Sequence, residues 1–228
     1  MRFRSIATFR SLRGEGSYLA ALLIAAAMFR SGAAAEPSTA DDYERRGSAH
    51  FIAGRFIESV ADFDAEIRLD SRRAPWHWKR GISLYYAGRY ADGAKQFEGY
   101  QTVDGNDVEN AVWRFLCQAR DENVGVERAR KGILPIKNDR RVPMMQVYDL
   151  FRGELKPADV LAAARSGAPT PAELAARLFY ANLYVGLYYD ALGEPTAAKP
   201  HLDAAAARAI DHYMGDVARV HARLAAKE

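Results

Sequence analysis

Apolar, small and charged residues recur in the same order along two stretches of the chain, residues 46–70 and 80–104, offset by 34 positions. Gly54 and Gly88 each follow a helical run, where glycine supplies a left-handed helix end, and an aromatic residue stands two positions later. Each copy therefore predicts a helix, a turn and a second helix. The matched positions are Arg46/Arg80, Gly47/Gly81, Ala53/Ala87, Gly54/Gly88, Arg55/Arg89, Phe56/Tyr90, Phe63/Phe97 and Asp70/Asp104.

The pattern weakens after the second copy but stays helical. Pro135 and Pro143 interrupt it, and Thr170 followed by Pro171 and Glu173 predicts a capped helix start. The expected helices cover residues 113–120, 125–134, 142–153, 157–165, 171–192, 195–208 and 211–227.

A further copy of the unit is predicted near the end of the chain. Gly186 and Gly193 repeat the seven-residue spacing of Gly81 and Gly88, each pair with a Tyr-Tyr dipeptide between its glycines. No segment alternates as a strand does. We expect an all-α fold, a short solenoid of stacked antiparallel helix pairs with extra C-terminal helices. Its parts are regular repeats at 40–73 and 74–107, a degenerate unit at 108–134, a helical insert at 135–169 and a repeat-like unit with a capping helix at 170–228.

The two regular copies resemble the tetratricopeptide repeat (TPR) family, whose period is 34 residues. Numbered from Ala40 and Ala74, they place Gly47 and Gly81 at position 8 and Phe63 and Phe97 at position 24, as that family does. The runs 77–81, 84–86 and 186–189 are similar to exported bacterial TPR proteins of the lipoprotein NlpI type. That resemblance implies an envelope adaptor, although this chain has no lipidation cysteine.

The TPR resemblance also implies a concave groove lined by the first helix of each unit. Its partner-binding residues here would be Phe51, Trp78, Ile82, Tyr85, Tyr86, Tyr180 and Leu187, with Glu44, Ser48 and Ile52 at neighbouring groove positions. An aromatic groove suits an extended or helical apolar segment. The alternative is that a short stack folds this groove over its own C-terminal helices, so that these aromatics become core residues.

The first 35 residues predict a cleavable export signal. Arg2, Arg4, Arg10 and Arg13 precede an apolar run at 18–29, which ends in small residues at 31–35. The run is shorter than the roughly 20 residues that span a bilayer. We expect cleavage after Ala35, no membrane anchor afterwards and a periplasmic or secreted protein; a transit peptide to an organelle lumen is the alternative.

Charge gives no reason to expect nucleic acid as a partner. The segment 1–35 holds five of the 32 basic residues and one of the 29 acidic ones, so the rest of the chain has a formal net charge near −1. The single cysteine, Cys117, lies in an apolar run and predicts a buried side chain without a disulfide.

No arrangement typical of an enzyme or a metal site is present in the sequence. The five histidines form no His-Glu-x-x-His pair, and there is no phosphate loop or Gly-x-Ser-x-Gly elbow. We expect no catalytic residue, metal or cofactor. The acidic stretch 104–109 is interpreted as a turn and helix cap. His201, His212 and His221, with the loop at Arg140, define the alternative of an end-of-stack hydrolase or metal-binding enzyme.

The preferred hypothesis is a non-enzymatic scaffold that binds envelope or secreted proteins through its concave face. The loop around Arg140, Arg141 and Met144 is a second candidate docking edge, because paired arginines stand beside adaptable methionines. A self-assembling homo-oligomer stays an alternative.

Overall fold

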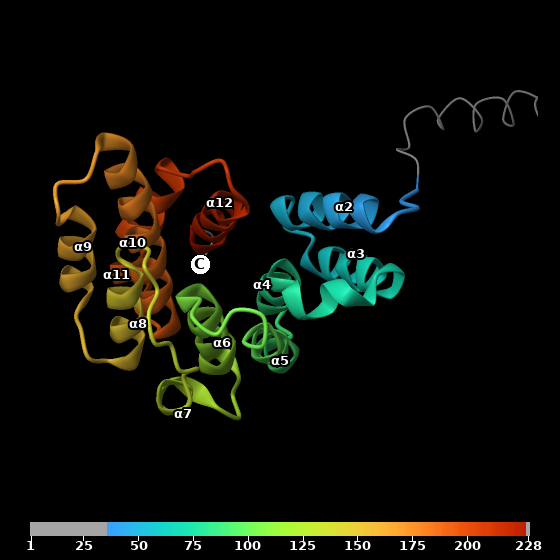
Figure 1. The fold of residues 1–228 in the computed structure, drawn as a ribbon, viewed down its shortest axis with the longest axis horizontal. Coiled ribbons are helices and arrows are strands. Elements are labelled where there is room, and N and C mark those ends of the chain that lie inside the picture. Colours follow the sequence, from blue (N-terminus) through green and yellow to red (C-terminus); the bar gives the residue numbers. More distant parts are fainter. Residues whose placement is uncertain (1–35, 227–228) are drawn as a thin grey trace, which may run out of the picture. The chain divides into compact units, whose positions relative to one another are not determined.

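The computed structural model describes residues 36–226, and within them the prediction of an all-α fold is confirmed (Figure 1). The predicted signal segment lies outside the described residues. Helices follow one another in antiparallel pairs, each pair packed on the next. In the first repeat these are α2 (Ala40–Ile52) and α3 (Phe56–Leu69), and in the second α4 (Trp78–Tyr86) and α5 (Tyr90–Tyr100). A short 3₁₀ helix, η1 (Ser71–Trp76), connects the two.

The less regular middle of the chain continues the stack. Helix α6 (Val108–Arg120) packs on α5, and α7 (Gly125–Lys131) packs on α6. The predicted insert forms α8 (Met144–Arg152), which packs on α6, and α9 (Pro157–Arg165), whose predicted bounds are confirmed.

The last three helices complete the fold. Helix α10 (Pro171–Ala191) begins at the predicted capping box, in which Thr170 Oγ1 accepts from the Glu173 backbone N–H and the Thr170 N–H donates to Glu173 Oε2. It pairs with α11 (Pro195–Ala207). Helix α12 (Tyr213–Ala225) then turns back and contacts α2, so the last helix of the described chain lies beside its first one (Figure 1).

Two kinds of glycine explain why the sequence forms these pairs. Gly54, Gly88 and Gly193 end the first helix of their units with φ of 77°, 73° and 73°, a backbone conformation that other residues rarely adopt. Gly47 and Gly81 instead make room for a ring of the second helix. A β-carbon on Gly81 would lie 2.6 Å from Phe97 Cζ, and one on Gly47 would lie 2.8 Å from Phe63 Cε1.

The C-terminal pair uses the same device with a different partner. A β-carbon on Gly186 of α10 would lie 2.7 Å from Leu202 Cδ2 of α11. Leu202 stands sixteen residues after Gly186, as Phe97 does after Gly81. The C-terminal unit therefore uses the same glycine-to-large-residue packing as the regular repeats, with leucine in place of phenylalanine.

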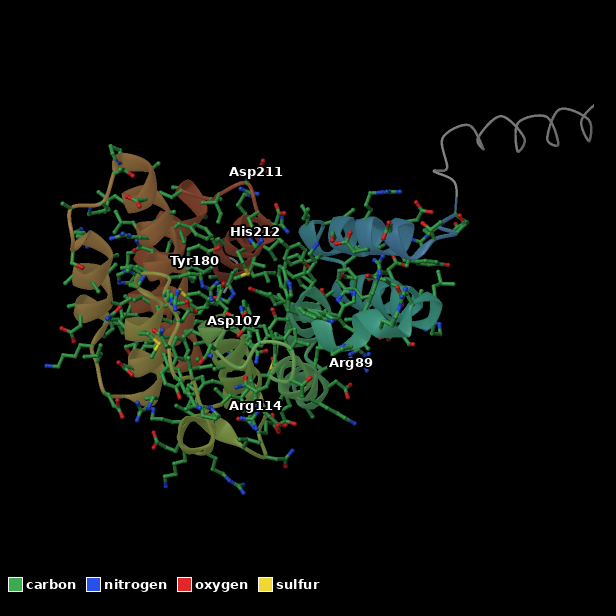
Figure 2. The ribbon with its side chains drawn as sticks, viewed as in Figure 1. Arg89, Asp107, Arg114, Tyr180, Asp211 and His212 are labelled. Atoms are coloured by element: carbon green, nitrogen blue, oxygen red, sulfur yellow. The ribbon has the colours of Figure 1, made fainter. Side chains whose placement is uncertain are left out.

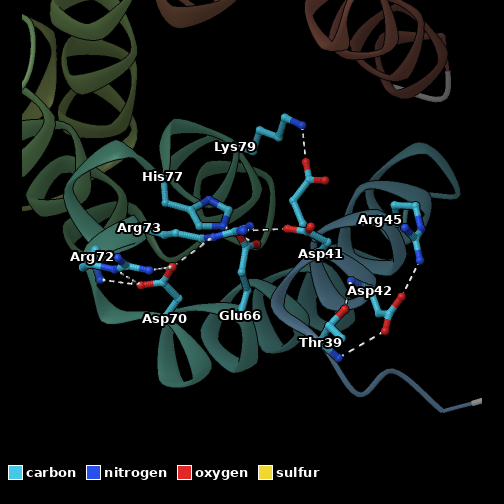
Figure 3. Close-up of polar contacts among 11 residues, drawn as sticks. Thr39, Asp41, Asp42, Arg45, Glu66, Asp70, Arg72, Arg73, His77 and Lys79 are labelled. Atoms are coloured by element: carbon cyan, nitrogen blue, oxygen red, sulfur yellow. Dashed lines mark hydrogen bonds and ion pairs between the residues drawn. The ribbon is translucent and has the colours of Figure 1, made fainter.

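A buried polar cluster ties the first repeat to the second (Figure 3). The Glu66 carboxylate, 3% exposed, lies 2.7 Å from His77 Nε2 and accepts from Arg73 Nη1 at 3.0 Å. Arg73 also donates to Asp41 at 2.6 Å, which links η1 to α2. Burial alone would raise the pKa of Glu66, but His77 and Arg73 outweigh it and hold that pKa below its ordinary value.

Alanine substitutions at Gly81, which is tightly packed, and at Gly99, which is not, should change the free energy of unfolding in opposite directions. Gly81→Ala forces its methyl group against the buried Phe97 ring and should lower the free energy of unfolding by about 1–3 kcal/mol. Gly99→Ala, near the end of α5 with open space around its Cα, should raise it by roughly 0.5–1 kcal/mol because glycine weakens a helix. Urea unfolding of both variants measures the difference, and equal effects would contradict the close packing of Gly81 on Phe97.

Candidate functional site

The concave face of the repeats is covered by the C-terminal helix. The Tyr213 ring, at the start of α12, lies 5.1 Å from Phe51 and 5.3 Å from Trp78 between ring centroids. His212 stacks on Trp78 at 5.9 Å, and Lys79 Nζ lies 5.1 Å from the Tyr213 ring centre. These contacts join α12 to both α2 and α4.

The predicted groove residues are therefore mostly core residues, which corrects their expected role as an open partner surface. Phe51, Ile82, Tyr85 and Leu187 are 6% exposed or less, because neighbouring helices and α12 cover them. Trp78, Tyr86 and Tyr180 are half-buried and pack against the same core. At these residues the structure agrees with the alternative prediction, in which the chain folds the groove over its own C-terminal helices.

The far end of α12 is held by polar contacts as well. The Tyr86 hydroxyl lies 2.8 Å from His221 Nδ1, and His221 Nε2 lies 3.5 Å from Asp190, which also accepts from Arg120 at 2.6 Å. Burial would raise the pKa of Asp190, but His221 and Arg120 outweigh it and lower that pKa. Arg223 donates to the Ile52 carbonyl at 2.8 Å and so closes the end of α2.

The three C-terminal histidines do not share a site. His201 Nδ1 lies 3.1 Å from Asn182 Oδ1, while His212 stacks on Trp78 and His221 lies between Tyr86 and Asp190. Among residues 36–226, no group of three or more His, Cys, Asp or Glu side chains is arranged to hold a metal ion. The metal-site alternative built on these histidines therefore has no geometry to support it.

One part of the concave face remains open as a groove between α2 and α12. Its volume is about 490 Å³. The predicted groove positions Glu44, Ser48 and Ile52 line its α2 side, and the start of α12 lines the other. Ile52 is 42% exposed there. The lining residues are Glu44, Arg45, Ser48, Ala49, Ile52, Lys79, Asp211, His212, Tyr213, Asp216 and Arg219.

A second hollow, of about 200 Å³, lies between α4, α5, α6 and the start of α12. Asp107, which caps α6, and His212, which caps α12, both line it (Figure 2). Its lining combines aromatic side chains with polar and charged ones. The lining residues are Trp78, Ile82, Phe97, Tyr100, Asp107, Glu109, Asn110, Trp113, Arg141, His212 and Met214.

Arg141 forms ion pairs with three carboxylates beside this cavity. Its guanidinium donates at 2.6 Å to each of Asp107, Glu109 and Asp139, and Tyr184 donates to Glu109 at 2.5 Å. Burial raises the pKa of Asp107 and of Glu109, although Arg141 opposes both shifts. Three carboxylates on one guanidinium leave an excess of negative charge here.

The structure corrects one of the three residues of the predicted docking edge, because Met144 is 1% exposed and lies in the core. Arg141 pairs with three carboxylates but stays exposed, so its role in docking stays a prediction. Arg140 is exposed, as expected of a docking residue. The predicted turn and cap at 104–109 is confirmed, because Asp107 accepts from the Glu109 backbone N–H at 3.1 Å.

Sequence reasoning missed Asn110 and Trp113 as cavity residues. Trp113 stands in an apolar run and Asn110 lies shortly before it, and nothing in their spacing distinguishes them as cavity residues. Cys117, in the same helix, is buried as predicted; a β-carbon on Gly93 would lie 2.8 Å from its Sγ.

Comparison with models of known protein families finds no match to this chain. The likeness to TPR proteins therefore stays a resemblance of pattern. Within the described part of the chain, no helix has the length and apolar character needed to cross a membrane.

Replacing Glu109 should change how stability depends on pH. The raised pKa means that the unfolded chain loses this proton first as the pH rises past the ordinary value of 4.5. Glu109→Gln avoids that ionisation, so its stability relative to the unaltered protein should increase with pH through this window. Urea unfolding at a series of pH values from about 4 to 7 measures the trend.

Glu173→Gln is the control of opposite sign. The Thr170 backbone N–H and hydroxyl lower the pKa of Glu173, so this carboxylate stabilises the fold above its ordinary pKa and stops doing so at lower pH. The Gln variant should therefore lose relative stability as the pH rises. Parallel trends in the two variants would contradict the assigned burial of Glu109.

Proposed function

We propose that this protein is a non-enzymatic scaffold or adaptor that holds a segment of a partner protein in the groove between α2 and α12. The observation that carries the proposal is the position of this groove. It lies on the concave side of the first repeat and is lined by Glu44, Ser48 and Ile52, the positions through which the resembling repeat family contacts partners. Helical solenoids present extended concave surfaces of this kind to other proteins.

The charges of the groove indicate the chemistry of the partner. Glu44, Asp211 and Asp216 are balanced by Arg45, Lys79 and Arg219, and two of the acids are already paired: Glu44 with Lys79 and Asp216 with Arg219. A strongly charged segment gains little from such a surface. A segment of low net charge with one apolar anchor side chain fits it best, with the anchor against Ile52 and Ala49.

The place of action follows from the beginning of the sequence. An Arg-rich start, a short apolar run and a small-residue end at 31–35 are typical of export signals. An exported scaffold meets envelope or secreted proteins, and these are the partners we propose. A second copy of this chain is an alternative occupant of the groove.

Two identical substitutions, one inside and one outside the groove, test the proposal. Ile52→Glu places an unpaired charge in the groove and should reduce recovery of the partner from envelope extract by about tenfold or more. Ile57→Glu makes the same change on α3, where Ile57 is 76% exposed and lies outside the groove, and should leave recovery unchanged. Quantitative mass spectrometry of affinity-purified complexes measures both.

The proposal requires a partner that is lost with Ile52→Glu and kept with Ile57→Glu. Equal recovery by the two variants would contradict it, as would the absence of any reproducible partner. The partner recovered with the unaltered protein could prove to be a second copy of this chain. Self-assembly then replaces the scaffold proposal. In that case light scattering should show an oligomer that Ile52→Glu dissociates and Ile57→Glu does not.

A further inference from the structure

Trp76 is the most exposed of the three tryptophans in the chain. It is 60% exposed at the end of η1, whereas Trp113 is 2% exposed and Trp78 is half-buried. Tryptophan offers a large apolar contact area and is enriched among the residues that dominate binding at protein interfaces. Trp76 is therefore a candidate contact for a partner protein.

Trp76 lines a hollow of about 190 Å³ beside the start of α2, which we call the Trp76 hollow. Arg73 lines it as well and donates to Asp41 at 2.6 Å (Figure 3). Asp41 lies in the first turn of α2, and Ile52 is the last residue of that helix. The Trp76 hollow and the exposed Ile52 side chain therefore belong to opposite ends of α2.

The Trp76 hollow adjoins the α2–α12 groove. Glu44 of α2 and Lys79 of α4 line both recesses, and these two side chains form an ion pair. The Glu44 side chain is 30% exposed and that of Lys79 is 27% exposed. The ion pair thus lies at the surface between the two recesses, where a bound segment can cross it. Together the recesses form one surface along α2, with Ile52 at one end and Trp76 at the other.

The charged side chains of the Trp76 hollow are already paired with one another. Glu66 pairs with Arg73 at 3.0 Å and lies 2.7 Å from His77, and Glu44 pairs with Lys79. A charged group from a partner would have to compete with these pairs and would gain little. An uncharged apolar side chain can pack on the Trp76 ring without disturbing them.

The length of α2 sets the spacing of the two contacts. Glu44 lies eight residues before Ile52 and Asp41 lies eleven before it, which corresponds to about 12 Å and about 16 Å along the helix. An extended segment advances about 3.3 Å per residue. Side chains of such a segment that reach both ends are therefore about four or five residues apart.

We propose that the partner segment in the α2–α12 groove continues into the Trp76 hollow and carries a second apolar side chain, which packs on Trp76. The segment runs along α2 in an extended form. Its two apolar side chains stand four or five residues apart, and polar residues between them cross the Glu44–Lys79 ion pair. This inference rests on the proposed function, because it extends the same bound segment.

Peptides from a random twelve-residue display library test this inference. Selection on the purified protein, after removal of peptides that also bind Ile52→Glu, yields ligands that depend on the groove. These peptides should share two apolar positions four or five residues apart. Trp76→Ala should weaken their binding by about tenfold or more, measured by titration calorimetry with the synthetic peptides.

Leu69→Ala is the matched control. Leu69 is a large apolar residue that is 56% exposed at the end of α3, and it lines neither recess. This variant should bind the selected peptides as tightly as the unaltered protein does. Thermal unfolding should show a similar Tm for both variants, because each removes a mostly exposed side chain.

Iodide quenching of tryptophan fluorescence gives a second readout in the unaltered protein. Trp76 is the tryptophan most accessible to iodide, so a peptide bound in the Trp76 hollow should reduce the quenching. Quenching that does not change at saturating peptide would contradict the contact.

The outcomes separate this inference from the proposed function. Peptides that need Ile52 but bind Trp76→Ala as tightly as the unaltered protein would overturn the inference and leave the groove as a binding site. Equal weakening by Trp76→Ala and Leu69→Ala would overturn it too. If no selected peptide depends on Ile52, both the inference and the proposed function fail.

Discussion

The structure depends on the insertion of α12 into the concave face of the repeats. Stacked helix pairs leave their inner surface aromatic, and a chain with few regular repeats has no neighbouring unit to cover it. Tyr213 covers Phe51 and Trp78 at one end, while His221 and Arg223 hold the helix at the other. The open groove and the aromatic cavity are two places where this helix leaves space on the face, and a further hollow lies where its C-terminal half meets Tyr85 and Tyr86.

The helices of each pair lie close together because a small residue on one faces a large residue on the other. Gly47 and Gly81 bring paired helices close because a ring occupies the volume of the missing side chain, and Gly186 does the same beneath Leu202. Helix α12 contacts α2, the first helix of the first pair. The polar contact between His221 and Asp190 holds the far end of α12.

Much of the fold could be predicted because its determinants are local. Three local signals predicted the helices. They are the glycine that ends a helix at Gly88, the capping box at Thr170 and the helical spacing of apolar residues, and each involves residues only a few positions apart. The candidate site depends on contacts between distant residues. Arg141 meets Asp107, 34 residues earlier, and Tyr86 meets His221, 135 residues later. A local pattern specifies neither pair, nor that Asn110 and Trp113 line a cavity.

Hydrogen exchange of the native protein tests the insertion of α12 most directly. If α12 is an integral part of the core, the amides of its buried residues, Val217, Ala218 and Val220, should exchange only through global unfolding. Their free energies of exchange would then equal those of Ile82 and Leu84 in α4. Exchange of α12 at a free energy several kcal/mol lower than that of α4 would mean that the helix detaches on its own, and it would contradict the role of α12 as the element that closes the concave face.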